Sequence, residues 1–321
     1  MLVRHTIMRE PLQIRVPLYG GRSGSTREVR PCSSVNRTVR AVGWILWFVA
    51  ATTAFSSSIV RLMMYASSSE LLSYIPLVPF VTCMLLFAQR HSLPRERHTS
   101  IAGALIVTVV GIGAASAAIA FRGRLSMNDD LALLTTAYAC IVVAGGFLFF
   151  GSTWMTAALF PMAFLAFMIP LPDAIVASFE RVSVMASADV AAWFFTATGT
   201  PLLRDGTHLA LPGIVLVVAQ ECSGIHSSWI LFITSLLAAW LFIESGWRRA
   251  FLVAFVLPLA IVRNAFRILV VGLLCVHVGP QMIDSPIHRR GGPLFFALSL
   301  IPLFAAMWWL RREPRPAMSE R

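Results

Sequence analysis

A short polar cluster, Glu221–Ser228, contains the side chains of this sequence that are best suited to chemistry. The cluster reads Glu-Cys-Ser-Gly-Ile-His-Ser-Ser and is followed by a long apolar run. It combines the thiol of Cys222 with a carboxylate, the imidazole of His226 and three hydroxyl groups. A cysteine thiolate is a good nucleophile, and a nearby cation lowers the thiol pKa from its usual value of about 8.5. The cluster therefore predicts chemistry at a membrane face.

Two other groups of polar residues occur beside apolar runs. Arg263, Asn264 and Arg267 interrupt the run from Phe251 to Val271, and His288 precedes the run at 291–310. An arginine near the centre of a spanning helix costs about 2.5–3.5 kcal/mol and usually faces the protein interior. A thiol, a guanidinium and an imidazole together suit acyl transfer through a thioester. The cation stabilises the thiolate or an oxyanion, and the imidazole protonates the leaving amine.

The composition predicts an all-α polytopic membrane protein. The 321 residues are 57% hydrophobic and 13% charged, and the mean hydropathy is +0.76, whereas about a quarter of the residues in soluble domains are charged. Runs of about 17–25 apolar residues can cross a bilayer as helices. About eight transmembrane helices are expected, at 41–60, 71–88, 101–121, 131–151, 153–169, 227–243, 251–273 and 291–310.

Arginines predict the orientation in the membrane. The net charge of +11 comes entirely from arginine and does not indicate a nucleic-acid partner, because most of these residues lie in tails and short loops. One side of the predicted topology carries 17 of them and the other side seven. Cytoplasmic loops carry the excess of basic residues. The sequence thus predicts a multi-pass membrane protein with both termini in the cytoplasm, and it does not specify an oligomeric state.

The expected domains follow from this topology. Residues 1–40, with eight arginines, are predicted to be a disordered cytoplasmic tail, 41–310 a membrane domain, and 311–321 a second cytoplasmic tail. The segment 170–226 is then an outer connection. Its first half has an apolar stripe at steps of three and four residues and is expected to be an amphipathic helix at the interface. The stripe consists of Ile175, Phe179, Val182, Ala186, Val190, Trp193 and Ala197.

The second half of this connection predicts a short β-hairpin before Cys222. Two β-like runs between Thr207 and Ala219 flank Pro212-Gly213, which is a turn signal. If the preceding helix crossed the membrane instead, the Arg-rich loop 244–250 would face outward. With the favoured topology, Arg267 lies roughly 24 Å along a hydrocarbon core of about 30 Å. That depth puts Arg267 level with Cys222 and His288, at the outer face.

Spacing alone leaves other interpretations open. Cys222 is then a structural residue or the partner of Cys275 in a disulfide, which an oxidising compartment permits. An arginine near a helix end often only extends to the interface. His226, His208 and His277 also fall on the predicted outer side and stand beside His288 as candidate acids or bases.

The order of these motifs resembles the exosortase/archaeosortase family of membrane cysteine enzymes. The resemblance covers about 150–310, and the first 150 residues match only as apolar spans. It begins with Gly-Thr-Pro and Arg-Asp-Gly at 199–206. An apolar hairpin then leads to Cys222-Ser223-Gly224, and the next motif is Asn264-Ala-Phe-Arg267. It ends with His288 followed by Gly292. One departure is Ile225-His226, where family members commonly have Leu-Arg or a similar pair.

The resemblance implies a mechanism and a class of substrate. Cys222 would be the nucleophile, Arg267 its cationic partner and His288 the acid and base. Supporting residues would be Asn264, Ser223, Gly224, Arg263, His226 and Gly292, within a catalytic part at about 170–296. The implied reaction is cleavage or transpeptidation at C-terminal sorting signals of exported proteins, linked to exopolysaccharide production. The implied location is the bacterial inner membrane, with the active site facing the periplasm. Such a signal has a Pro-Glu-Pro-type motif, an apolar helix and a basic tail. No cofactor or metal is implied.

Other function classes make different use of the same residues. A transporter or polysaccharide-export component would bind an anionic substrate with Arg263 and Arg267, but it gives the Cys-Ser-Gly motif no role. An inactive scaffold of an export complex would need none of these side chains. A metalloprotease is disfavoured because the sequence has no His-Glu-x-x-His motif.

Overall fold

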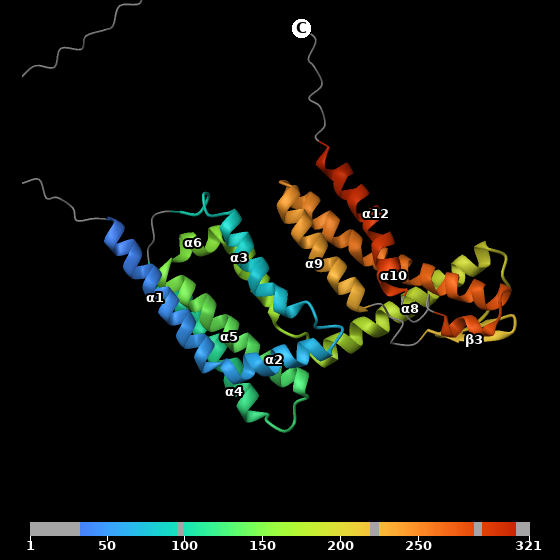
Figure 1. Ribbon diagram of the computed structural model, residues 1–321, viewed down its shortest axis with the longest axis horizontal. Coiled ribbons are helices and arrows are strands. Elements are labelled where there is room, and N and C mark those ends of the chain that lie inside the picture. The colour runs from blue at the N-terminus through green and yellow to red at the C-terminus, as the bar shows by residue number, and fades with distance from the viewer. Residues whose placement is uncertain (1–32, 95–98, 219–224, 286–290, 313–321) are drawn as a thin grey trace, which may run out of the picture. The chain divides into compact units, whose positions relative to one another are not determined.

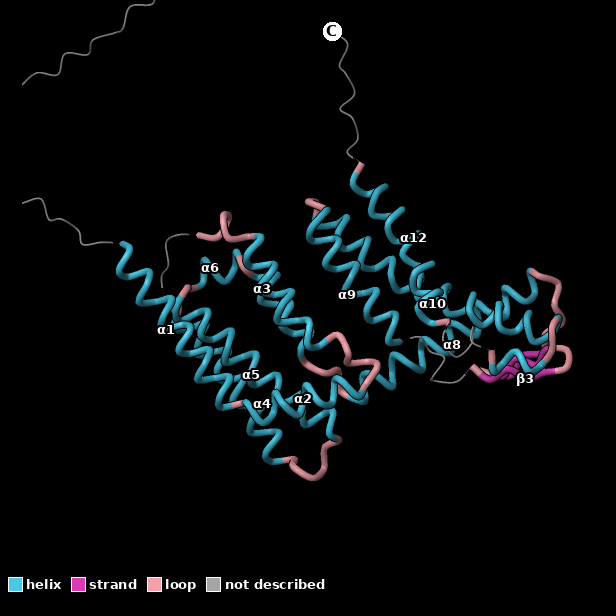
Figure 2. Tube along the Cα trace, in the orientation of Figure 1, coloured by secondary structure: helices cyan, strands magenta, loops and turns pink. Residues whose placement is uncertain are grey.

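The computed structural model describes residues 33–94, 99–218, 225–285 and 291–312. The chain divides into two compact units, Met1–Val39 and Arg40–Arg321, and the packing described here lies within the second. This unit consists of helices and one small sheet (Figures 1 and 2). The predicted tails 1–40 and 311–321 lie almost wholly outside the described residues.

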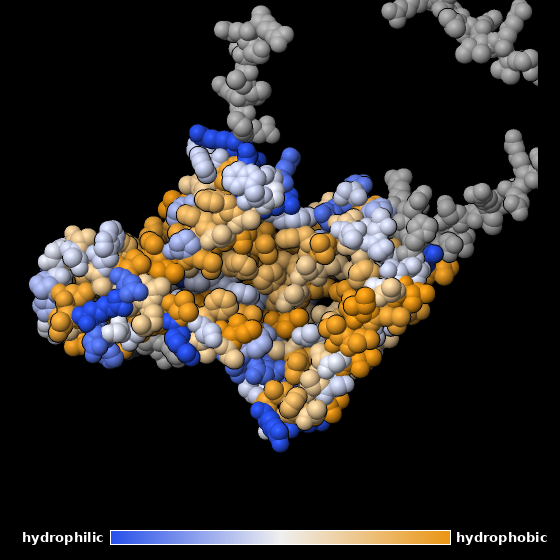
Figure 3. Space-filling model, turned by 180° about the vertical axis from the view of Figure 1, so that it is seen from behind, coloured by the Kyte–Doolittle hydropathy of each residue, from blue (hydrophilic) through white to orange (hydrophobic). Residues whose placement is uncertain are grey.

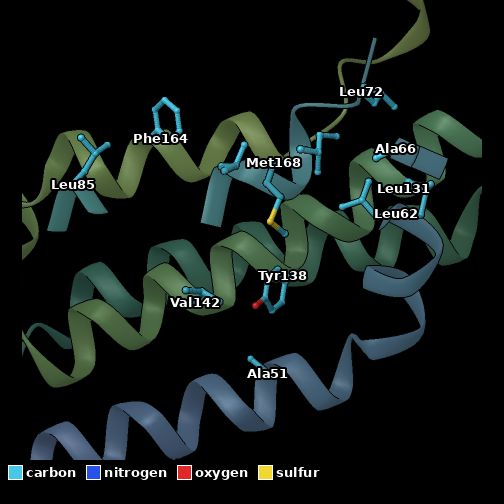
Figure 4. Packing of buried hydrophobic residues seen from close by; sticks show 12 residues of the cluster. Ala51, Leu62, Ala66, Leu72, Leu85, Leu131, Tyr138, Val142, Phe164 and Met168 are labelled. Carbon is cyan, nitrogen blue, oxygen red and sulfur yellow. The ribbon is translucent and has the colours of Figure 1, made fainter. Parts of the chain in front are cut away.

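The amino-terminal half packs around a common apolar core. Its elements are α1 (Ser33–Ala54), α2 (Ser56–Ser68), η1 (Ile75–Leu77), α3 (Val78–Ala88), α4 (Ile101–Ala120), α5 (Met127–Phe149), α6 (Ser152–Ala157), α7 (Leu159–Phe164) and η2 (Leu165–Met168). Residues of this core come from α2, the loop after it, α5, α7 and η2, and Figure 4 labels Leu62, Leu72, Leu131, Phe164 and Met168 among them. The core thus joins segments that are about a hundred residues apart.

The carboxy-terminal half is arranged around the long helix α10 (Gly246–His277). Its other elements are α8 (Asp173–Ala197), β1 (Leu203–Asp205), β2 (His208–Leu211), β3 (Ile214–Val217), α9 (Ile225–Phe242), η4 (Pro280–Asp284) and α12 (Gly292–Arg311). Helices α8, α9 and α12 all pack against α10. Small buried residues at these contacts, such as Ser235, Ala239 and Ser299, let the helix backbones approach closely.

The fold is that of a polytopic membrane protein, but it has fewer clear spans than the eight predicted. Within the described ranges, five helices are long and apolar enough to cross a membrane, or up to seven if each of two bent pairs is one span. The predicted span 41–60 bends by 69° between α1 and α2, and the apolar helix in 71–88 is only Ile75–Ala88. The predicted span 153–169 is divided into α6, α7 and η2. Apolar side chains cover much of the surface in Figure 3, as expected for helices in lipid.

Helix α8 follows η2 after a bend of 91°. The bend is held by α5, where the Asn128 side chain donates to the Leu171 carbonyl at 2.7 Å and to Asp173 Oδ1 at 2.8 Å. The Asp173 main-chain N–H donates in turn to Asp129 Oδ1 at 2.9 Å. These bonds fix the direction in which α8 leaves the amino-terminal half.

The apolar stripe predicted for 175–197 lies mainly on the exposed side of α8. Phe179, Val182 and Trp193 are all more than half exposed, whereas the buried side is made of Val184, Ser187, Ala188, Ala191 and Phe195. The buried side packs against α10. Helix α8 is therefore apolar on two sides. One side packs against α10, and the other is exposed and available to lipid.

The sheet before the Cys-Ser-Gly motif has three antiparallel strands in the order β1-β2-β3, rather than the two expected. The turn between β2 and β3 is Pro212-Gly213, and Gly213 has a φ of +81°, which favours glycine. The additional strand β1 is anchored by Arg204, which forms an ion pair with Asp189 of α8 and donates to the Gly206 carbonyl at 2.9 Å. Leu209, Leu211 and Leu216 then bury the sheet against α8 and α10.

Candidate functional site

Several predicted site residues lie outside the described residues: Cys222, Ser223, Gly224 and His288. The structure describes the elements on either side of them. Strand β3 ends at Val217 and α9 begins at Ile225, while η4 ends at Asp284 and α12 begins at Gly292. The remaining predicted residues lie within the described part of the chain: Arg263, Asn264, Arg267, His226 and Gly292.

The first turn of α9 lies beside the arginines of α10. Arg263 is only 7% exposed, and its Nη2 donates to Ser228 Oγ at 3.0 Å. At the other end of the same helix pair, Arg249 Nε donates to the Ile243 carbonyl at 2.5 Å. These two contacts define an antiparallel register, in which one helical turn beyond Arg263 corresponds to the beginning of α9. Arg267 is therefore level with Ile225, where α9 begins.

The beginning of α12 reaches the same level. The rings of Phe266 and Phe295 are 6.3 Å apart in an edge-to-face arrangement. Arg248 Nη1 donates to the Leu310 carbonyl at 3.0 Å, so α12 also runs antiparallel to α10. Gly292, three residues before Phe295, is then level with the turn of α10 that contains Arg267. The first turns of α9 and α12 thus converge on Arg267.

Asn264 occupies a different side of α10. It is 2% exposed, and its Nδ2 has no hydrogen-bond partner among the described residues. The neighbouring residue Ala265 belongs to the cluster that packs against α8. On α8, Ser187 is fully buried, and in the described part of the chain its Oγ also lacks a partner. Asn264 is therefore buried on α10 between the face that carries Arg263 and the face that packs against α8.

Asn264 and Ser187 are at the same height in this contact. A Cβ added to Gly272 would lie 2.4 Å from Phe195 Cζ, so these two residues touch. Asn264 and Ser187 each precede that contact by eight residues on helices that run in the same direction toward the sheet. Because every residue of an α-helix adds the same length along the axis, eight residues correspond to the same distance on both helices. Two buried polar atoms, Asn264 Nδ2 and Ser187 Oγ, thus lie at one level of these two helices.

The other candidate histidines occupy separate places. His226 is half-buried in the first turn of α9, on a different face from Ser228. His277 ends α10 and is exposed, about 15 Å along the helix axis from Arg267. His208 is exposed on β2 and pairs with Val217 of β3. Of these three, only His226 shares the level at which α9, α10 and α12 converge.

Two alternatives from the sequence can be compared with the structure. Cys275, the alternative disulfide partner, is a free thiol on α10 with 2% exposure. Across the described segments, no group of three His, Cys, Asp or Glu residues is placed to hold a metal ion.

Sequence reasoning missed the loop between α2 and η1. Leu71 and Tyr74 of this loop lie near His226 and Trp229 at the beginning of α9, and Glu70 is near enough for its charge to act on His226. The only local signal was a single acidic residue, Glu70, between a serine-rich stretch and an apolar run. The contact itself joins segments more than 150 residues apart, and no local pattern predicts it.

Comparison with known proteins gives one family. The family model described as Transmembrane exosortase (Exosortase_EpsH) matches residues 65–305, which include the loop after α2, the arginines of α10 and the first turns of α9 and α12. No protein of curated function matches the chain. No solved structure matches it either.

Proposed function

Because the chain belongs to the transmembrane exosortase family, we propose that it is a membrane cysteine protease or transpeptidase with Cys222 as its nucleophile. Family membership supports the processing of sorting signals in general. The observation that carries the assignment of residues is the convergence of α9 and α12 on Arg267, since Cys222 precedes α9 and His288 precedes α12 by only a few residues.

The surroundings of Arg267 suit a thiolate nucleophile. The start of a helix carries a partial positive charge, and Cys222 comes three residues before the first residue of α9. The guanidinium of Arg267, one helical turn from Arg263, adds a full positive charge at the level where α9 begins. Both effects lower the pKa of a thiol and stabilise an oxyanion. Arg263 acts differently, because its bond to Ser228 holds α9 in this register.

The proposed reaction is acyl transfer in two steps. The Cys222 thiolate attacks the carbonyl carbon of the scissile peptide, a C–S bond forms, and Arg267 stabilises the oxyanion. The C–N bond then breaks, and the departing amine takes a proton from His288. Water or an amine next attacks the thioester, which returns the thiol. Water gives hydrolysis and an amine gives transpeptidation.

The proposed substrate is the C-terminal sorting signal of an exported protein, with a Pro-Glu-Pro-type motif, an apolar helix and a basic tail. The apolar helix would enter from the bilayer, and the motif would reach Cys222 at the outer face of the inner membrane. Exposed apolar side chains on α8, including Phe179 and Trp193, are compatible with a lipid-embedded partner. The link to exopolysaccharide production is part of the same proposal.

Single substitutions test this function. Cys222→Ala, Arg267→Ala and His288→Ala are expected to abolish or severely reduce processing of a co-expressed cognate substrate, measured as a mass shift. Cys83→Ala is the matched control, because Cys83 is an exposed thiol on α3 in the amino-terminal half. Processing by Cys222→Ala at the wild-type rate would overturn the proposal.

The transporter interpretation makes the opposite prediction for the thiol. If Arg263 and Arg267 bind a transported anion, alkylation of Cys222 leaves transport intact and the arginine substitutions abolish it. Under the proposed function, alkylation of Cys222 alone abolishes processing.

A further inference from the structure

A partly open cavity of about 490 Å³ lies at the end of the α9–α10–α12 bundle that is opposite the candidate site. The end of α9, the link to α10, the first turn of α10 and the end of α12 all contribute to it. Pockets that bind small ligands have volumes of about 300–1,000 Å³, so this cavity can hold a small polar group. Its lining includes Phe242, Glu244, Ser245, Arg248, Leu310 and Arg311.

Two arginines are held in place beside this cavity. Arg248 Nη1 donates to the Leu310 carbonyl at 3.0 Å, and this bond uses one of the five N–H donors that a guanidinium has. Arg311 lies over the Phe242 ring, with its Cζ 5.5 Å from the ring centroid. Both contacts restrain a side chain and leave it N–H groups for another acceptor. A guanidinium is well suited to bind a phosphate, because its planar fork of donors matches the phosphate oxygens.

A carboxylate lines the same cavity without neutralising these arginines. Glu244 is exposed, and within the described part of the chain it forms no ion pair with Arg248 or Arg311. The cavity therefore presents positive and negative groups that are not paired with one another. A complementary ligand carries a phosphate for the arginines and a cationic group for the carboxylate.

Aromatic residues indicate the position of the cavity in the membrane. Trp247, Trp308 and Trp309 are exposed at this end of the helices, and Arg312 lies over the Trp308 ring at 3.4 Å from its centroid. Tryptophan is enriched at membrane–water interfaces, where lipid headgroups lie. Helices α9, α10 and α12 are each long and apolar enough to cross a membrane, so their ends are expected at this level. The phosphate compounds of that layer are phospholipids.

We propose that this cavity binds the headgroup of an ethanolamine phospholipid, with the phosphate on Arg248 and Arg311 and the ammonium group on Glu244. The hydroxyl of Ser245 makes no capping bond to α10 and is a further donor to the phosphate. The acyl chains extend beside Phe242 into the bilayer. A glycerol headgroup has no cation for the carboxylate, and a choline headgroup has no N–H group to donate. This inference concerns the end of the bundle away from the proposed active site and does not depend on the proposed function.

Native mass spectrometry of the full-length protein in detergent measures this binding without a protein substrate. Phosphatidylethanolamine, phosphatidylglycerol and phosphatidylcholine with the same acyl chains are titrated separately, and the occupancy by one lipid gives the Kd of each. We expect the lowest Kd for phosphatidylethanolamine, because only this headgroup offers both a phosphate and an N–H cation. An equal or lower Kd for either of the other two lipids would overturn the proposal.

Three substitutions locate the bound lipid. Arg311→Gln is expected to raise the Kd of phosphatidylethanolamine about fivefold. Glu244→Gln is expected to remove the preference for phosphatidylethanolamine over phosphatidylglycerol. Arg312→Gln is the matched control, because Arg312 is also exposed at this end but does not line the cavity, and it is expected to leave the Kd unchanged. Equal effects of Arg311→Gln and Arg312→Gln would mean that the charge of this membrane face, and not the cavity, holds the lipid.

A soluble headgroup separates the lipid from a free phosphate ester. Glycerophosphoethanolamine carries the same headgroup without acyl chains, and at equal concentration it is expected to displace no lipid, because it lacks the apolar surface that the lipid buries. Displacement at that concentration would assign the cavity to a soluble ligand and would overturn the proposal. Glu244 and Arg311 are exposed, so their substitution is not expected to disturb the core, and thermal unfolding of each variant checks this.

Discussion

At the scale of single residues, the bond between Arg263 and Ser228 connects the α10 arginines to α9. Ser228→Ala removes the acceptor for Arg263 Nη2, at a site where the guanidinium is 7% exposed. The loss of a partner for a buried polar group costs about 1–3 kcal/mol. We expect a fall of that size in the free energy of unfolding in detergent, measured by chemical denaturation.

A second hydroxyl on the same helix provides the comparison. Thr234 donates to the Ile230 carbonyl of its own helix at 2.8 Å and makes no cross-helix bond among the described contacts. Thr234→Ala is expected to change the free energy of unfolding by less than about 0.5 kcal/mol. Equal losses for Ser228→Ala and Thr234→Ala would contradict a special role for the Arg263 bond.

Tyr74 gives a prediction about pH. Burial raises the pKa of its hydroxyl above the usual 10.0, and the contact with Trp229 partly opposes that shift. Below the unfolded pKa both states keep the proton, so stability is unaffected. Above it, the unfolded chain loses the proton first, so the folded state loses stability as pH rises. Tyr74→Phe is therefore expected to lose less stability than the wild type between about pH 9 and 11, measured by thermal unfolding. An equal loss of stability with pH in the wild type and in Tyr74→Phe would show that Tyr74 does not contribute.

At the scale of elements, the contact between α8, the sheet and α10 depends on Gly272. An added Cβ would lie 2.4 Å from Phe195 Cζ and 3.1 Å from Leu211 Cδ1. Phe195 is fully buried and has little room to move. Overpacking of this kind costs about 1–3 kcal/mol, so Gly272→Ala is expected to lower the unfolding temperature.

Two further variants decide whether packing is the cause. Gly113→Ala on α4 meets no atom within 4 Å among described neighbours and is expected to be neutral or stabilising. Phe195→Leu makes room beside Gly272, so the double variant is expected to lose less than the sum of the two single losses. An additive result would mean that Gly272 acts through its backbone and not through this contact.

The same elements show what the sequence could predict. Helices α4, α9 and α12 begin and end within two residues of the predicted spans, because an uninterrupted apolar run of sufficient length has few alternatives in a bilayer. The bend at Phe55 was not predicted, because hydropathy records burial and not the direction of the backbone. The interfacial helix expected after 169 implied a change of direction before α8, but not the contacts that produce it. Bonds such as Asn128 to Asp173 join distant segments and set that direction.

In the candidate site, too, the sequence predicted features that depend on nearby residues and missed those that depend on contacts between distant segments. Arg263 and Arg267 stood out because charged residues in an apolar run need a protein environment. The burial of Asn264 depends on which helices cover each side of α10, and the four-residue motif from Asn264 to Arg267 does not contain this information. Glu70 was missed for the same reason, since its proximity to His226 depends on the packing of the loop after α2 against α9.

At the scale of the whole molecule, the distribution of arginines predicts which end of the α9–α10–α12 bundle faces the cytoplasm. One end holds Arg248, Arg249 and Arg311, and Arg311 lies over the Phe242 ring at 5.5 Å from its centroid. The positive-inside rule assigns this end to the cytoplasm. The first turns of α9 and α12 are at the opposite end and would then face the periplasm, where exported substrates arrive.

Thiol labelling in intact cells tests this orientation. In a chain whose native cysteines are replaced by alanine, Gln281→Cys and Glu244→Cys each place one exposed thiol near opposite ends of α10. A membrane-impermeant maleimide, admitted through the outer membrane, is expected to label Gln281→Cys and to leave Glu244→Cys unlabelled until the inner membrane is opened by detergent. The reverse pattern would place the α9 and α12 first turns in the cytoplasm. Cys222 would then be inaccessible to exported proteins, and the proposed substrate class would be wrong even if the thiol chemistry is correct.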